Sequence, residues 1–121
     1  MFINPKEKLR DVKIVNEKEK NDIKNFLQGA VYCWCKNRKN ERFSLQSLMG
    51  GENFYWEGTP LIRLYEERKK ICAKTAIKEA AKAAGWLLKT VLAKDKRKFD
   101  SKIEARNKSY WCVDLKNSSE Q

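Results

Sequence analysis

The sequence predicts a mainly α-helical domain that ends in a short β-hairpin. Two stretches, residues 16–39 and 75–95, carry apolar side chains at helical spacing. Near the C-terminus, two short segments with aromatic and β-branched residues flank a polar loop, which is typical of a hairpin. The 121 residues suffice for one domain with one core. We expect a flexible N-terminal arm at residues 1–15, the domain at residues 16–115 and a tail at residues 116–121.

The first helix has the most complete signals. Asn16 is its predicted N-cap, and Glu19, three residues later, completes a capping-box pattern. The helix should continue to about residue 39 and bury one stripe of side chains: Ile23, Phe26, Leu27, Ala30, Val31, Trp34 and Cys35. In the arm before it, Val12, Ile14 and Val15 are available to pack against the domain.

Two further helices are predicted before the basic part of the chain. Ser44 should cap a short helix at residues 45–49, which Gly50 and Gly51 end. Thr59 and Pro60, a capping hydroxyl followed by proline, predict another helix that runs to about residue 70. The loop between them is rich in aromatic residues (Phe54, Tyr55 and Trp56), and alternation along it should bury two of the three.

The stretch at residues 75–98 predicts an amphipathic basic helix that weakens near Asp95. At about 100° per residue, the predicted apolar face spans about 140° and comprises Ile77, Ala80, Ala81, Ala84, Leu87, Leu88, Val91 and Leu92. A narrower neighbouring arc carries Lys78, Lys82, Lys89 and Lys96, with Trp86 close by. We therefore expect one side of this helix to pack on the core and the other to face a polyanion, although a solvated helix face is the alternative reading.

A hairpin is predicted from residues 99–103 and 109–115, joined by the basic loop EARNK. The order of long helix, short helix, further helices and terminal ribbon resembles a winged helix-turn-helix domain over residues 16–115. The resemblance implies that the helix before the hairpin, around residues 86–98, enters the major groove. It also implies that the hairpin loop, residues 102–108, contacts the DNA backbone or the minor groove, with Arg106 and Lys108 on phosphates.

A second pattern lies inside the basic helix. Ala81, Gly85 and Val91 match helix-turn-helix spacing, which would break the helix at Gly85 and make residues 87–96 the recognition helix. The apolar stripe passes through Gly85 without a phase shift, and its neighbours are strong helix formers, so a continuous helix is favoured. Both versions place the same lysines beside nucleic acid.

Charge supports nucleic acid as the partner. The formal net charge is +11, and residues 68–108 hold 14 basic against 4 acidic side chains. Arg97 and Asn107 are the nearby side chains of the types that pair bidentately with bases. The predicted nucleic-acid-binding residues are Lys78, Lys82, Trp86, Lys89, Lys94, Lys96, Arg97, Lys98, Lys102, Arg106 and Lys108.

Several classes of protein have little support. Histidine is absent, and so are glycine-rich phosphate loops and G-x-S-x-G elbows, so we expect neither an enzyme nor a bound cofactor. The four cysteines form no C-x-x-C pair, which argues against a metal site and favours buried free thiols. No apolar run approaches the ~20 residues of a membrane span, and the N-terminus does not read as a signal peptide. A cytoplasmic location is therefore expected.

Taken together, these features predict a small DNA-binding regulator or accessory factor of bacterial or phage origin, docking on duplex DNA. An alternative from another class is a protein-interaction module, such as a phage-type inhibitor that binds a host protein through the aromatic and acidic loop at residues 52–67. A second alternative is RNA binding. Tyr32 and Cys33, which lie off the main stripe of the first helix, leave a homodimer open.

Overall fold

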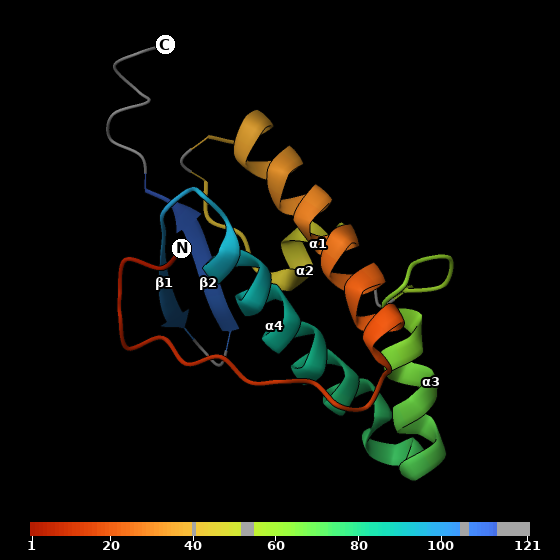
Figure 1. Ribbon diagram of the computed structural model, residues 1–121. Coiled ribbons are helices and arrows are strands. Elements are labelled where there is room, and N and C mark those ends of the chain that lie inside the picture. Colours follow the sequence, from red (N-terminus) through yellow and green to blue (C-terminus); the bar gives the residue numbers. More distant parts are fainter. Residues whose placement is uncertain (40, 52–54, 105–106, 114–121) are drawn as a thin grey trace.

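A central helix, α4, is surrounded by the other elements (Figure 1). This computed structural model describes residues 1–39, 41–51, 55–104 and 107–113. Helices α1 and α3 pack against α4, and the mainly helical chain ends in an antiparallel hairpin, as the sequence predicts. The elements are α1 (Glu17–Asn37), α2 (Leu45–Leu48), α3 (Ile62–Ile71), a 3-10 turn (Ala73–Thr75), α4 (Ala76–Lys94), β1 (Phe99–Glu104) and β2 (Asn107–Cys112).

Helix α1 begins at the predicted capping box. The Asn16 side chain accepts a hydrogen bond from the Glu19 backbone N–H at 2.8 Å, and the Glu19 carboxylate accepts one from the Asn16 N–H at 3.1 Å. The helix ends two residues earlier than expected. Its buried stripe includes Lys20, whose ammonium donates to the Asp11 carboxylate at 2.7 Å. The fully buried members of the stripe are Ile23, Leu27 and Val31.

The connection from α1 to α4 follows its local signals. Ser44 caps α2 by accepting from the Ser47 N–H at 3.2 Å, and Gly50 and Gly51 end the helix with φ of 93° and 116°. The helix predicted from Thr59 begins slightly later, at Ile62. In the aromatic loop, Trp56 is buried and Tyr55 is 80% exposed, whereas Phe54 lies outside the described residues.

Helix α4 passes through Gly85 without a break, so the continuous helix is confirmed. It ends at Lys94, and Asp95 is buried directly after it. The predicted apolar face is wrong at Ile77, which is 56% exposed. Ile77 lies in the first turn of α4, at the end of the helix that is farthest from the hairpin (Figure 1). At Ile77, therefore, no other element covers the predicted apolar face of α4 completely.

The hairpin closes the core with aromatic side chains. Phe99 pairs with Cys112 at one end of the ladder, and Glu104 pairs with Asn107 at the other. Phe43, between α1 and α2, forms an antiparallel bridge with Tyr110, and its ring lies 6.1 Å from that of Phe99. Strand β2 ends earlier than predicted, and residues 114–121, including the predicted tail, lie outside the described part.

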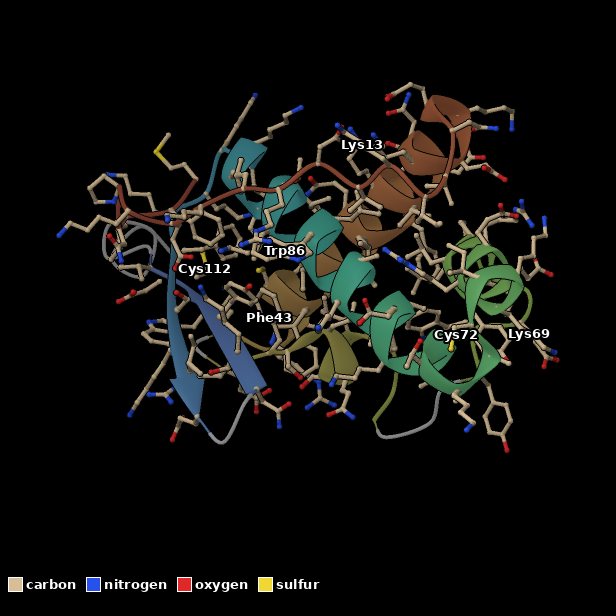
Figure 2. The ribbon with its side chains drawn as sticks, turned by 90° about the horizontal axis from the view of Figure 1, so that it is seen from below. Lys13, Phe43, Lys69, Cys72, Trp86 and Cys112 are labelled. Atoms are coloured by element: carbon tan, nitrogen blue, oxygen red, sulfur yellow. The ribbon has the colours of Figure 1, made fainter. Side chains whose placement is uncertain are left out.

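The description of residues 1–15 as a flexible arm separate from the domain differs from the structure. Phe2 forms a parallel bridge with Phe99, and the ammonium of Met1 donates to the carbonyl of Asp95 at 2.6 Å. Val12 and Val15 are buried in the core, as their apolar character suggests. Between these anchors the arm runs along α4 (Figures 1 and 2). Its packing depends on contacts with residues more than 80 positions away, which local patterning cannot reveal.

None of the four cysteines forms a disulfide. The expectation of burial is wrong for Cys33 and Cys72, which are exposed, whereas Cys35 and Cys112 are half-buried. Burial raises the pKa of Cys35 to about 11, and a hydrogen bond with the Thr75 hydroxyl lowers that of Cys72. In the described part of the chain, no helix combines the length and apolarity that crossing a bilayer requires.

Candidate nucleic-acid interface

The expected reading helix lies inside the domain. Nine of the 19 residues of α4 are buried, because alanines and leucines cover more of its circumference than one stripe. Helices α1 and α3 pack against it, and the arm crosses another of its faces (Figure 2). The part of α4 near Trp86 is therefore covered and cannot enter a major groove in this arrangement. The buried residues are Ala76, Ala80, Ala83, Ala84, Leu87, Leu88, Lys89, Val91 and Leu92.

The predicted lysine row is interrupted at Lys89. This residue is only 8% exposed, and its ammonium lies 3.0 Å from the Glu7 carboxylate of the arm. Buried charges require such a partner, since an unpaired charge away from water is very costly. The prediction that Lys89 faces solvent is thus wrong, and the cause is a carboxylate 82 residues earlier in the chain.

Trp86 is engaged by the protein itself. Its ring is half-buried, with the Arg10 guanidinium 4.8 Å and the Lys89 ammonium 5.0 Å from the ring centroid. These are cation–π distances. Trp86, one of the predicted nucleic-acid-binding residues, is therefore covered by the arm in this arrangement.

Arg97 is also committed to an internal contact. Its guanidinium donates to both oxygens of the Asp95 carboxylate, at 2.9 and 2.6 Å. Burial raises the pKa of Asp95, but hydrogen bonds from Arg97 and Gln28 outweigh it and lower this pKa to about 2. The predicted base-reading arginine is therefore held away from a ligand. The predicted lysines around it remain exposed: Lys94, Lys96 and Lys98.

The two described lysines of the hairpin lie on opposite faces. Lys102 pairs with Ser109 across the ladder, whereas Lys108 pairs with Ile103, and successive side chains of a strand alternate in direction. Lys102 is exposed, and its ammonium lies 4.0 Å from the Glu104 carboxylate. Lys108 is half-buried, 2.6 Å from Glu7. Arg106 lies outside the described residues. The described hairpin therefore does not present the single cationic tip that was expected.

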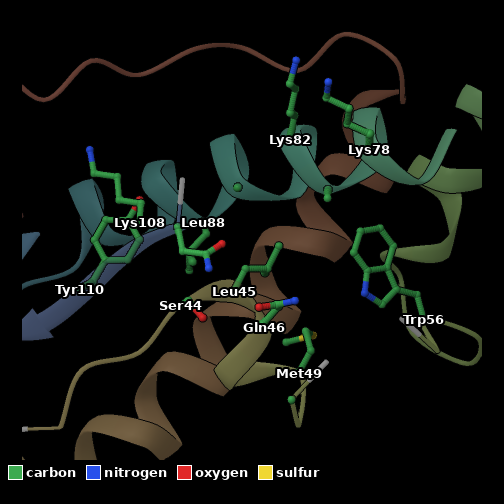
Figure 3. Close-up of a pocket in the computed structure, with 14 residues that line it drawn as sticks. Ser44, Leu45, Gln46, Met49, Trp56, Lys78, Lys82, Leu88, Lys108 and Tyr110 are labelled. Carbon is green, nitrogen blue, oxygen red and sulfur yellow. The ribbon is translucent and has the colours of Figure 1, made fainter. Parts of the chain in front are cut away.

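Lys78 and Lys82 keep their predicted place on the exposed side of α4. Lys82 lies 3.4 Å from Glu79, a weak surface pair. Both lysines border a cavity of about 370 Å³ between α2, α4 and β2, and their ammonium groups point away from its floor at Leu45 and Met49 (Figure 3). The small residues Ala81 and Gly85 line the α4 side of this cavity.

The sequence reading missed the cations of the arm. Lys6, Lys8, Arg10 and Lys13 are all exposed. Arg10 and Glu7 contact α4 at Trp86 and Lys89. Helical spacing puts these two α4 residues on the same face as Lys78 and Lys82. We call the resulting group the arm–helix surface. It consists of Lys6, Lys8, Arg10, Lys13, Lys78 and Lys82.

A signal for this surface was present in the charge count. Residues 1–40 hold 10 basic against 5 acidic side chains. The carboxylates near the surface are largely neutralised: Glu7 by two lysines and Asp11 by Lys20. By contrast, three carboxylates gather around Arg63 at the contact between α1 and α3: Glu19, Glu66 and Glu67. The cluster around Arg63 therefore has more carboxylates than cations.

Comparison of the chain with protein-family models, with curated proteins and with solved structures gives no match. Among the described residues, no group of three His, Cys, Asp or Glu side chains lies close enough together to hold a metal ion. Function therefore has to be inferred from the arrangement of charges.

Proposed function

We propose that this protein binds nucleic acid, most readily duplex DNA, through phosphate contacts made by the arm–helix surface. The observation that carries the proposal is that the arm crossing α4 has exposed cations, as α4 itself has at Lys78 and Lys82, while the nearby carboxylates are already paired. If all six cations contact phosphates, the logarithm of the binding constant falls with the logarithm of salt concentration with a slope of about −5.

Such an interface positions the protein on the backbone and reads little sequence. Its donors are lysines and one arginine, which supply charge-assisted contacts to phosphates. Arg97, the arginine expected to read bases, is occupied by Asp95, and the Arg10 guanidinium lies over the Trp86 ring. A role as an accessory factor or regulator that uses DNA shape and charge follows from this composition.

We retain a winged-helix-like architecture as part of the proposal. The order of α1, α2, α4 and a C-terminal hairpin supports it, with α3 as an additional helix before α4. Because the arm covers α4, the proposed contact surface is the arm–helix surface and not an exposed reading helix. The four cysteines form no disulfide, which supports a location in the cytoplasm, where thiols stay reduced.

A gel shift with a random 20-bp duplex at 50 and 200 mM salt tests the proposal. Reversing charge at Lys6, Lys8 and Lys82 together should weaken binding by about 100-fold or more and flatten the salt slope. The matched control reverses Lys36, Lys69 and Lys70, three exposed lysines of α1 and α3, and should retain most of the affinity.

Equal losses in the two triple variants would show a general charge effect and refute the assigned surface. Unchanged binding in the first triple variant would refute it as well. A melting curve of each variant confirms that the fold is kept. Stronger binding to hairpin RNA than to duplex DNA would favour RNA as the ligand.

A second candidate function, binding of a protein partner, is favoured by an exposed apolar patch. Tyr55 and Ile77 are 80% and 56% exposed and border a hollow of about 240 Å³ together with Ile62 and Tyr65. Apolar patches of this kind often mark interaction sites. Tyr55→Ala tests this candidate cleanly, since Trp56 is buried and its removal would perturb the core.

In that case a stoichiometric host protein should co-purify with the wild type and be lost with Tyr55→Ala, while DNA binding is absent. A homodimer through Tyr32 and Cys33, both exposed on α1, is a separate proposal. Light scattering at two protein concentrations distinguishes monomer from dimer.

A further inference from the structure

Glu7 is the buried member of the charged residues in the arm. The other charged positions, 6, 8, 10, 11 and 13, are exposed. Its side chain is 8% exposed, whereas its neighbours Lys6 and Lys8 are exposed. The carboxylate lies 3.0 Å from the Lys89 ammonium and 2.6 Å from that of Lys108. It also accepts a hydrogen bond from the Ser101 hydroxyl. Three donors from α4, β1 and β2 thus converge on one carboxylate from the arm.

Two ammonium groups that converge on one point form a donor pair suited to a phosphate. Lys89 and Lys108 both have Glu7 as their carboxylate partner in the described part of the chain. We infer that Lys89 and Lys108 form a phosphate-binding site for the nucleic-acid backbone, and that Glu7, held in place by the Ser101 hydroxyl, occupies this site as an internal competitor. The inference rests on the proposed function.

The arm is built so that this segment can leave α4 without disturbing the core. It is anchored before Glu7 by the Phe2 bridge and after it by buried Val12. Between the anchors, Ile3 and Leu9 are 46% and 48% exposed and bury little apolar surface. Apart from Glu7, the main side-chain contact of this segment with α4 is that of Arg10 with Trp86. Opening therefore breaks polar contacts that a phosphate can replace.

Opening would also expose the part of the predicted lysine row that lies on α4. Lys96, the fourth member of that row, follows the end of the helix at Lys94. Lys78, Lys82 and Lys89 lie on one face of α4 over about 16 Å of helix at ~1.5 Å per residue, and Trp86 would be uncovered. A ligand that needs the open form binds with its affinity reduced by the fraction of open molecules. The closed arm therefore weakens binding, and any change that loosens Glu7 should strengthen it.

Ser101→Ala tests this inference without changing charge. Loss of a hydrogen bond to a charged group should raise the open fraction and tighten binding to the random 20-bp duplex by about five- to tenfold. Ser109→Ala is the matched control, because Ser109 lies on the opposite face of the same hairpin, and it should bind like the wild type.

Glu7→Gln should give a larger gain and a salt slope steeper by about two, since Lys89 and Lys108 become available to phosphates. Glu79→Gln is its control, because it removes one negative charge beside Lys82 and leaves the arm in place. If Glu7→Gln does not fold, which a melting curve shows, Ser101→Ala alone decides.

The outcomes separate the two proposals. If the wild type binds the duplex and Ser101→Ala binds it no more tightly than Ser109→Ala does, the inference is overturned and the proposed function stands. If Ser101→Ala and Glu7→Gln both bind the duplex more tightly than the wild type and the two controls, the inference is supported. This includes the case in which the wild type shows no binding. No binding by any of these proteins at 25 mM salt overturns both.

Discussion

Replacing Glu7 by glutamine should make the free energy of unfolding less dependent on pH in the acidic range. Burial of the Glu7 carboxyl raises its pKa, but hydrogen bonds from Lys108, Ser101 and Lys89 outweigh this effect and lower the pKa from 4.5 to about 2. The folded protein therefore favours the ionised carboxylate. Its contribution to stability is complete above pH 4.5 and is lost as the pH falls towards 2.

The size of the effect follows from the two pKa values. A tenfold change in proton affinity corresponds to about 1.4 kcal/mol, so the ionised carboxylate contributes about 3 kcal/mol to the free energy of unfolding at pH 7. Less than half of this contribution should remain at pH 3 and little of it at pH 2. Glu7→Gln would leave Lys89 without its carboxylate partner. Removing one partner of a buried ion pair generally lowers the free energy of unfolding by a similar amount, about 3–5 kcal/mol.

Urea unfolding of the wild type and Glu7→Gln at pH 7, 5, 4, 3 and 2 measures this difference. A protonated glutamic acid closely resembles glutamine, so the two unfolding curves should converge as the pH falls. Glu41→Gln, which removes an exposed carboxylate paired with Arg38, should change the free energy of unfolding by less than about 0.5 kcal/mol. A constant gap between wild type and Glu7→Gln from pH 7 to 2, or no gap at pH 7, would refute the reasoning.

Three further predictions concern the backbone, the thiols and the core. Gly85→Ala should stabilise the protein by about 0.5–1 kcal/mol, because Gly85 is helical and an added Cβ meets nothing within 4 Å. Gly58→Ala, at φ of 80°, should destabilise it, and thermal unfolding compares the two. With Ellman's reagent at pH 8, exposed Cys72 should react fastest and Cys35, with its pKa raised by burial, slowest; equal rates would contradict this. Leu27→Ala, at a fully buried site, should lower the urea-derived free energy of unfolding by about 2–5 kcal/mol, and a loss below 1 kcal/mol would contradict its place in the core.

Local signals in the sequence predicted the elements of the fold well. The capping box at Asn16 sets the start of α1, and Gly50 and Gly51 end α2 where a positive φ is needed. The unbroken apolar phase through Gly85 predicted a continuous α4. Each of these features depends on residues within a few positions of one another, so the spacing of side chains was sufficient to reveal it.

The candidate site was predicted less well, because its residues were chosen by charge and helical position alone. Lys89 has the right spacing for an exposed row, yet Glu7 neutralises and covers it. Lys102 and Lys108 flank the same loop but project from opposite faces, since the register of the hairpin fixes their alternation. The cations of the arm join the surface through contacts that only the folded chain makes.

The sequence by itself determined which segments are helical, where the hairpin lies and that the chain carries a large positive charge. Tertiary structure decided which of those charges face solvent. The reason is physical: Glu7 meets Ser101 and Lys108 across 94 and 101 positions of the chain. Pairing with the Glu7 carboxylate lets Lys89 be buried and Lys108 be half-buried, although both carry a charge.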